Sequence, residues 1–310
     1  MRSQGKIKRP GSKISRAHGT EITLAFRPPY NWQTIIRFYM THPIPGVERV
    51  TEDSFERVFR IGNAIGFFQV GAMFDEPQLK LSTTITDPKI LGEVISRVRR
   101  MFDLDTDPLL IANRFDQVPI LARLCARFPG LRVPGGWDPF ETAICSILGQ
   151  LVSAAQRSTL VGQIVRSYGD EITHPISGET MRLFPRPEIL AQSELGEVRT
   201  TAARREAIRD LSRRVMGGAI SFSKAQDPVA FRKALLDTKG LGPWSAEYIS
   251  LRAIGDTDAF PKTDLVLKRA LKLHPDLDLE SIKPWRSYAA IYLWKEFAET
   301  LSRKNKEKQT

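Results

Sequence analysis

The sequence predicts an α+β protein in which a small antiparallel sheet domain precedes a larger domain built only of helices. Three observations support this fold class. Residues 21–86 contain short apolar runs, in part alternating with polar residues, as strands do. Nearly every segment after residue 107 instead repeats its apolar residues at helical spacing. The 310 residues, 42% of them hydrophobic, suffice for two or three compact units.

The sheet domain is expected at residues 21–112. Its first strand alternates through Ile22 and Leu24 and ends at Pro28, after which Asn31 is typical of a residue that caps a helix. Further strands are predicted where apolar runs are separated by Gly, Asp, Glu or Pro, at 54–62, 64–74 and 78–85. Asp87 and Pro88 then begin a helix that reaches about residue 102.

The helical domain is expected at residues 113–301. Gly- and Pro-containing segments separate its helices, and the first of them begins just before this boundary. The predicted helices are 107–113, 116–127, 138–150, 153–168, 187–192, 201–216, 227–237, 243–254, 263–272 and 284–299.

The charge of the chain is concentrated at its ends. The formal net charge is +11, of which residues 1–20 carry +6 and residues 302–310 carry +3, which leaves +2 for the body. Such polar, basic ends are predicted to be disordered tails. They either keep the protein in solution or attract nucleic-acid phosphates without sequence preference.

Composition excludes several classes of protein. No apolar run is long enough to span a bilayer, and the first residues contain no apolar signal segment. We therefore expect a reducing compartment, in which Cys125 and Cys145 are free thiols. Two cysteines and four scattered histidines do not provide the ligands of a zinc site or an iron–sulfur cluster.

One segment has the pattern of a helix-hairpin-helix. Residues 227–237 and 243–254 are predicted helices, and Lys239, Gly240, Leu241 and Gly242 join them in a tight turn. Backbone N–H groups at such a turn and helix start can bind a phosphate without side-chain charge. The alternative is a helical hairpin that only packs. Asp264 follows 22 residues after Gly242 and starts the next helix, either as a catalytic carboxylate or as its N-cap.

Several stretches together resemble a known family. LDTKGLGPWSAEYISLRAIG followed by FPKTDLVLKRAL resembles the helix-hairpin-helix DNA glycosylase superfamily. The stretches FRPPYNW, MFDLDTDP, FPGLRVPGGWDPFE, ILGQLVSAAQ and KPWRSYAAIYLW are similar to the AlkA-type 3-methyladenine DNA glycosylases II. The resemblance covers about residues 21–301. It implies an N-terminal sheet domain like half of a TATA-box-binding protein, then two helical subdomains with the site in the cleft between them.

The resemblance implies an activity and its residues. The family hydrolyses the N-glycosidic bond of alkylated bases such as 3-methyladenine and 7-methylguanine in base excision repair, after the base has been flipped out of duplex DNA. Asp264 matches the catalytic carboxylate, acting electrostatically or as general base. The base pocket corresponds to Trp244, Tyr248 and Trp294, whose ring faces attract a cationic base. Simple core packing is the alternative for these rings.

The remaining implied contacts are with DNA. Leu151, after Gln150, matches the residue that fills the gap left by the flipped base, although its spacing alone suits a core leucine. Lys239, Gly240, Leu241 and Gly242 form the DNA-binding hairpin. Superfamily members with lyase activity carry a Lys two residues after the second hairpin glycine. Because this chain has Trp244 there, we predict a glycosylase without lyase activity.

The resemblance also concerns cofactors, partners and location. No cofactor is required, but the backbone carbonyls of Leu236, Thr238 and Leu241 match a Na⁺ or K⁺ site at the hairpin. The expected partner is double-stranded DNA with damaged bases, bound by a monomer in the bacterial cytoplasm, near the nucleoid and away from membranes. Two alternatives stay open: a glycosylase for oxidised or deaminated bases, and a catalytically silent protein that binds damaged DNA.

Overall fold

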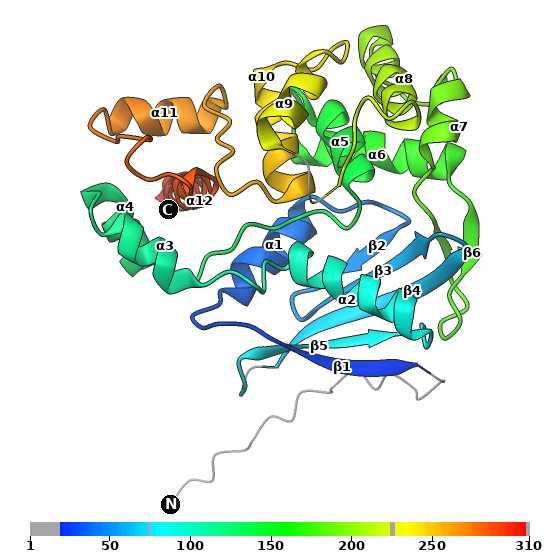
Figure 1. The fold of residues 1–310 in the computed structure, drawn as a ribbon, viewed down its shortest axis with the longest axis horizontal. Coiled ribbons are helices and arrows are strands. Elements are labelled where there is room, and N and C mark those ends of the chain that lie inside the picture. The colour runs from blue at the N-terminus through cyan, green and yellow to red at the C-terminus, as the bar shows by residue number, and fades with distance from the viewer. Residues whose placement is uncertain (1–18, 74, 224–226, 308–310) are drawn as a thin grey trace, which may run out of the picture.

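The computed structural model describes residues 19–73, 75–223 and 227–307, and it confirms the predicted α+β class (Figure 1). A five-stranded antiparallel sheet with the order β1-β5-β4-β3-β2 precedes the helical region. The register pairs Leu24 with Leu79 and Val58 with Phe67. The strands are β1 (Thr20–Ala25), β2 (Glu48–Val50), β3 (Ser54–Ile61), β4 (Ala64–Met73) and β5 (Gln78–Thr83).

Two helices cover one face of this sheet. Helix α1 (Trp32–Thr41) starts where the Asn31 side chain accepts the Thr34 N–H at 2.9 Å, and α2 (Pro88–Met101) starts at an Asp87 cap, as predicted. The apolar stripes of both helices and the inward side chains of the strands form one buried cluster. Amphipathic helices on one face of a sheet bury that face, so this unit has its own core.

The helical region forms two groups, seen on either side of α1 in Figure 1. In one group the buried apolar residues come from α3 (Pro108–Phe115), α4 (Pro119–Arg127), α11 (Leu265–Leu273) and α12 (Arg286–Glu307). The other group contains α5 (Pro139–Gly149), α6 (Ala154–Tyr168), α7 (Pro187–Gln192), α8 (Ala202–Met216), α9 (Pro228–Leu236) and α10 (Pro243–Ile249). The chain passes between the groups after α10, through a π-helical turn, η1 (Ser250–Ile254).

Sequence patterns missed the shortest elements. The strands β2, β6 (Glu171–Thr173) and β7 (Thr180–Arg182) have three residues each. Three residues are too few to show the alternation of apolar and polar side chains by which a strand is predicted. The hairpin of β6 and β7 lies in the segment predicted as an irregular break between helices.

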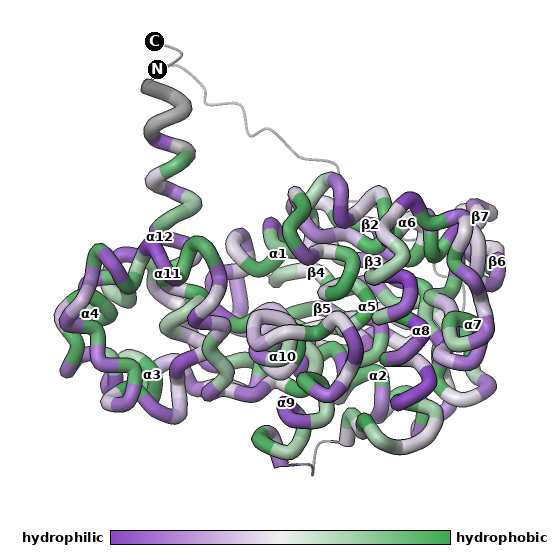
Figure 2. The backbone as a smooth tube through the Cα atoms, turned by 90° about the horizontal axis from the view of Figure 1, so that it is seen from above, coloured by the Kyte–Doolittle hydropathy of each residue, from purple (hydrophilic) through white to green (hydrophobic). Residues whose placement is uncertain are grey.

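Two predicted boundaries were wrong. The domain boundary after residue 112 falls inside α3, whose Ile111 and Phe115 are buried in the second helical cluster. The C-terminal tail predicted as disordered begins inside α12, which continues through Glu307 and projects from the body in Figure 2. No Gly or Pro interrupts residues 286–307, so nothing in the sequence ends the helix at 301. The tail segments 1–18 and 308–310 lie outside the described residues.

A buried ion cluster joins the sheet domain to the helical region. The Arg57 side chain on β3 is 1% exposed and donates hydrogen bonds to the carboxylates of Glu48 on β2 and Glu141 on α5. Burial raises the pKa of Glu141 to about 8, although the attraction of Arg57 opposes this shift. One guanidinium can neutralise only one of the two carboxylates, so the second tends to keep its proton.

Candidate active site

A cavity of about 330 Å³ lies where α1, the α5–α6 turn, α10 and α12 meet. A cavity of this size is typical of a small-molecule site. Asp264 is the one carboxylate among the described residues that line it. The predicted pocket residues also lie in its wall, so one site contains Trp244, Tyr248, Asp264 and Trp294.

The Asp264 carboxylate is fixed by four donors. Its Oδ1 accepts the N–H groups of Val266 at 2.9 Å and Leu267 at 3.2 Å, which makes it the N-cap of α11. The indole Nε1–H of Trp294 donates to Oδ1 at 3.0 Å, and that of Trp244 donates to Oδ2 at 3.1 Å. The interpretation of Asp264 as an N-cap is therefore confirmed, and the same carboxylate also lines the cavity. Its orientation is set before any ligand binds.

The aromatic rings form the walls. Trp244 and Tyr248 lie one helical turn apart on α10 and stack with centroids 5.0 Å apart and planes 15° apart. Tyr248 meets Trp294 of α12 edge to face at 6.3 Å. Phe38 of α1 closes the cavity from the sheet domain, and we did not select it from the sequence. Its position outside the buried stripe of α1 was the available signal.

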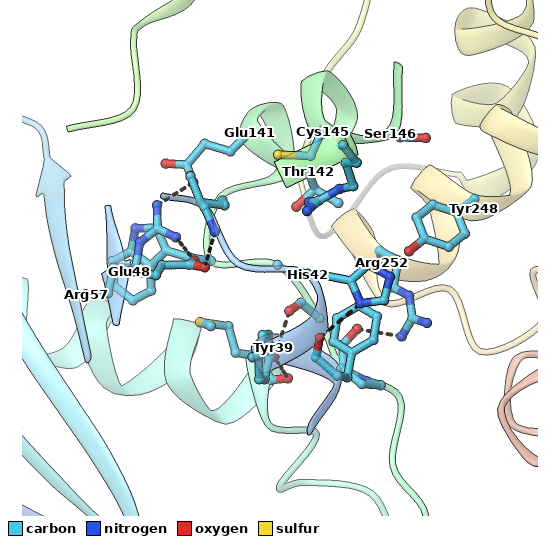
Figure 3. A pocket seen from close by; sticks show the side chains of 18 residues that line it. Tyr39, His42, Glu48, Arg57, Glu141, Thr142, Cys145, Ser146, Tyr248 and Arg252 are labelled. Atoms are coloured by element: carbon cyan, nitrogen blue, oxygen red, sulfur yellow. Dashed lines mark hydrogen bonds and ion pairs between the residues drawn. The ribbon is translucent and has the colours of Figure 1, made fainter. Parts of the chain in front are cut away.

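Three basic side chains of the cavity were also missed: His42, Arg157 and Arg252. Figure 3 shows His42 and Arg252 close to Tyr248 around the adjoining part of the cavity, below Cys145. Burial, followed by the charge of Arg157, lowers the pKa of His42 to about 4. The imidazole is therefore neutral near pH 7, and its Nδ1 donates to the Phe38 carbonyl at 3.0 Å. A charged residue inside the apolar run ISLRAIG was the sequence signal for Arg252.

Leu151 occupies a strained position next to Val152, which lines this cavity. It follows Gln150 in the turn between α5 and α6, has a φ of 55°, and is 96% exposed. A left-handed conformation is uncommon for a branched residue, and an apolar side chain this exposed contacts almost nothing in the protein. The prediction of a core leucine from spacing alone is wrong. The side chain projects outward, as an inserted residue must.

The hairpin between α9 and α10 is tied to the same turn. The Gln150 amide Nε2 donates to the Gly240 carbonyl at 3.1 Å and to the Ser245 hydroxyl at 2.9 Å. Gly240 has a φ of 81°, and a Cβ there would lie 2.9 Å from the Cβ of Ala207, so glycine is required. The hairpin and Leu151 consequently belong to one surface.

Two hairpin details bear on its expected ligands. The Lys239 N–H donates to Asp210 Oδ2 at 3.0 Å, so this amide has a protein partner, while the Leu241 side chain is buried. Among the carbonyls expected to bind a cation, that of Thr238 accepts the Leu241 N–H at 3.1 Å. A carbonyl oxygen has two lone pairs, so this bond leaves one for an ion. α9 ends at Leu236, whose carbonyl is one of the last four of the helix.

Two searches of the described residues were negative. No group of three or more His, Cys, Asp or Glu side chains in the described part of the chain is placed to hold a metal ion. Within residues 19–73, 75–223 and 227–307, no helix is long and apolar enough to cross a membrane.

The fold and the hairpin define the class: this is the fold of the helix-hairpin-helix glycosylases. It matches the solved structure of a 3-methyladenine DNA glycosylase from Archaeoglobus fulgidus with a TM-score of 0.74 at 19% identity, over 88% of this chain and 96% of that one. Residues 21–138 match the family model of the AlkA N-terminal domain.

Curated relatives agree with this class. The chain is 28% identical to DNA-3-methyladenine glycosylase 2 of Escherichia coli, over 88% of this chain and 96% of that protein. It is 31% identical to a Mycobacterium tuberculosis protein named "Probable bifunctional transcriptional activator/DNA repair enzyme AlkA", over 91% of this chain. It spans 58% of the length of that relative. The chain thus has an AlkA N-terminal domain and is a homologue of the AlkA-type 3-methyladenine DNA glycosylases.

Proposed function

We propose that the protein is a DNA glycosylase that hydrolyses the N-glycosidic bond of alkylated bases in double-stranded DNA, without lyase activity. One observation carries the proposal: Asp264 is fixed by four donors in the wall of a cavity lined by Trp244, Tyr248 and Trp294. The transition state of glycosidic hydrolysis has the character of an oxocarbenium ion. A preoriented carboxylate stabilises that positive charge without reorganisation during the reaction.

Base flipping is part of the proposal, because Asp264 lies in the wall of a cavity. A base inside a duplex cannot reach Asp264, so the nucleotide must rotate out of the stack at a cost of a few kcal/mol. Leu151, exposed beside the cavity on the α5–α6 turn, is placed to occupy the vacated position. Gln150 links this turn to the hairpin. Insertion and backbone binding would therefore occur together.

The hairpin is proposed to bind the DNA backbone. Gly240 and Gly242 allow close approach of a phosphate to the start of α10, whose N-cap residue Gly242 offers no capping side chain. The Lys239 amide takes no part in this proposal because Asp210 already accepts it. The exposed Lys239 side chain remains available for a phosphate contact. The carbonyls of Leu236, Thr238 and Leu241 are proposed to bind Na⁺ or K⁺, whose charge would favour a nearby phosphate.

Water, not a lysine, is proposed as the nucleophile. A Schiff base needs a lysine amine at the reacting sugar carbon. The residue two positions after Gly242 is Trp244, whose indole N–H binds Asp264, and no lysine lines the cavity in the described part of the chain. Hydrolysis would leave an abasic site with an intact backbone. We place this repair activity in the cytoplasm, with the chromosome.

The variant Asp264→Asn tests the function. Duplexes carrying 7-methylguanine, hypoxanthine or 8-oxoguanine are incubated with protein, and the released bases are identified by chromatography. Loss of the carboxylate should lower base release at least 10²-fold with DNA binding retained. Asp227→Asn is the matched control, because Asp227 caps α9 through the Val229 and Ala230 N–H groups and lies outside the cavity. Both variants keep a capping oxygen.

The outcomes separate the candidate functions. Release of only 8-oxoguanine would replace the alkylated-base assignment with one for oxidised bases. DNA binding without release of any base would indicate a silent damage-binding protein. Equal base release by wild type and the Asp264 variant would refute the mechanism. A nicked backbone at the product site would refute the absence of lyase activity.

A further inference from the structure

Arg252 places a permanent positive charge in the cavity wall. Its side chain is 6% exposed, and its guanidinium lies over Phe38 at 4.4 Å, Tyr248 at 5.4 Å and Trp294 at 5.6 Å from the ring centroids. These three rings line the cavity in which a flipped base would lie. Tyr248 and Trp294, two of the three rings expected to attract a cationic base, therefore already interact with a cation of the protein.

The guanidinium also has unused donors. Nη1 donates to the Pro134 carbonyl at 2.9 Å, which is its single hydrogen bond in the described chain, and Nε is buried without a partner (Figure 3). No carboxylate pairs with Arg252 among the described residues. The candidate in the cavity wall, Asp264, accepts hydrogen bonds from Trp244, Trp294 and the first turn of α11 instead. A buried donor without an acceptor is costly, so an acceptor on a bound base would be stabilising.

The other titratable groups of the cavity do not offset this charge. Arg157 adds a second guanidinium, His42 is neutral, and Asp264 supplies one negative charge. The cavity is therefore cationic by one charge before a base enters. A base that is itself cationic adds like charge in a desolvated space, where repulsion is strong. A neutral base with a carbonyl group brings an acceptor instead.

We propose that Arg252 assists the release of neutral, carbonyl-bearing bases, which adds these bases to the alkylated ones of the glycosylase function proposed above, on which this inference rests. When the N-glycosidic bond of a neutral base breaks, the bonding electron pair leaves with the base, which becomes an anion. A guanidinium against its carbonyl stabilises that developing charge. Water adds to the sugar carbon and loses a proton, and the base gains one on release. A cationic base leaves as a neutral molecule and needs no such help.

The test compares two lesions in otherwise identical duplexes. Hypoxanthine is the neutral, carbonyl-bearing probe, and 3-methyladenine is the cationic probe without a carbonyl. Arg252→Met should lower the ratio of hypoxanthine release to 3-methyladenine release in single turnovers at least tenfold, the factor expected for one charge-assisted hydrogen bond. Arg252→Lys keeps the charge with fewer donors and should show a smaller loss, confined to hypoxanthine.

Arg132→Met is the matched control. Arg132 is 2% exposed, donates to the carbonyls of Arg27 and Pro29, lies 5.2 Å from the Tyr30 ring centroid, and does not line the cavity. It should lose stability without changing the ratio of the two rates. If Arg252→Met does not fold, the ratio of the two release rates in Arg252→Lys tests the proposal instead.

Parallel loss of both rates in a folded Arg252 variant would overturn the inference, as would a wild type that releases 3-methyladenine but no hypoxanthine. A wild type that releases no base at all would instead overturn the glycosylase function itself. The two failures are therefore distinguishable.

Discussion

Replacing Glu141 by Gln should remove a pH dependence of stability that the buried ion cluster creates. Glu141 and Glu48 share Arg57, and burial raises the pKa of Glu141 to about 8 from an ordinary value of 4.5. Between these two pH values the folded protein holds a proton that the unfolded chain has lost. The free energy of unfolding therefore falls as pH rises through this window.

The size of the effect follows from one proton. When only the folded state holds this proton, the free energy of unfolding falls by up to about 1.4 kcal/mol per pH unit. From pH 6 to pH 8 we expect Glu141 to lower the free energy of unfolding by roughly 2 kcal/mol, because the slope declines as the pKa is reached. Glu141→Gln keeps a polar group of the same shape against Arg57 and cannot ionise. It should match wild type near pH 5 and exceed it in stability above pH 8.

The free energy of unfolding is measured by urea unfolding, followed by tryptophan fluorescence, at steps of half a pH unit from pH 5 to pH 9. Glu93→Gln is the control, because Glu93 is exposed on α2 and pairs with Arg97 at the surface, where an ion pair contributes little. The difference between the Glu141 variant and wild type should widen with pH, while that of the control stays constant. Parallel profiles for all three proteins would refute the shared-proton account of the cluster.

Other predictions concern the rest of the molecule. Leu151→Gly should lower base release but leave the unfolding midpoint unchanged or higher, since glycine tolerates a φ of 55° and the exposed side chain has no packing to lose; a lower midpoint in urea would contradict this. His42→Asn should flatten the loss of stability between pH 6.5 and pH 4, because the folded pKa of about 4 makes protonation favour the unfolded chain. Gly240→Ala should destabilise the hairpin, measured as a lower thermal midpoint, by clash with Ala207. Removing residues 1–18, which spares β1, should reduce the slope of DNA affinity against salt, measured by fluorescence anisotropy.

The extent of correct prediction differs between long and short elements. Helices such as α2, α6 and α8 were placed within about two residues because each combines an N-cap with several turns of apolar spacing. The strands β3 to β5 were found because each is an apolar run of six or more residues bounded by Gly, Asp, Glu or Pro. The strands β2, β6 and β7 were not found, because three residues are too few to show an alternating pattern. The end of α12 was placed too early, because no residue near its C-terminus marks the end of a helix.

The sequence by itself determined the α+β order, the helix-hairpin-helix, and the candidate set of Asp264, Trp244, Tyr248 and Trp294. These features depend on residues that lie close together in the sequence, and the family motifs are short, contiguous stretches. Only the tertiary structure decided which side chains share the cavity. Phe38 and His42 come from the sheet domain, and Arg252 is buried in the same cavity wall with no carboxylate paired to it among the described residues. A pocket's charge is a sum over segments far apart in the chain, so its preference for neutral or cationic ligands cannot be read before the chain is folded.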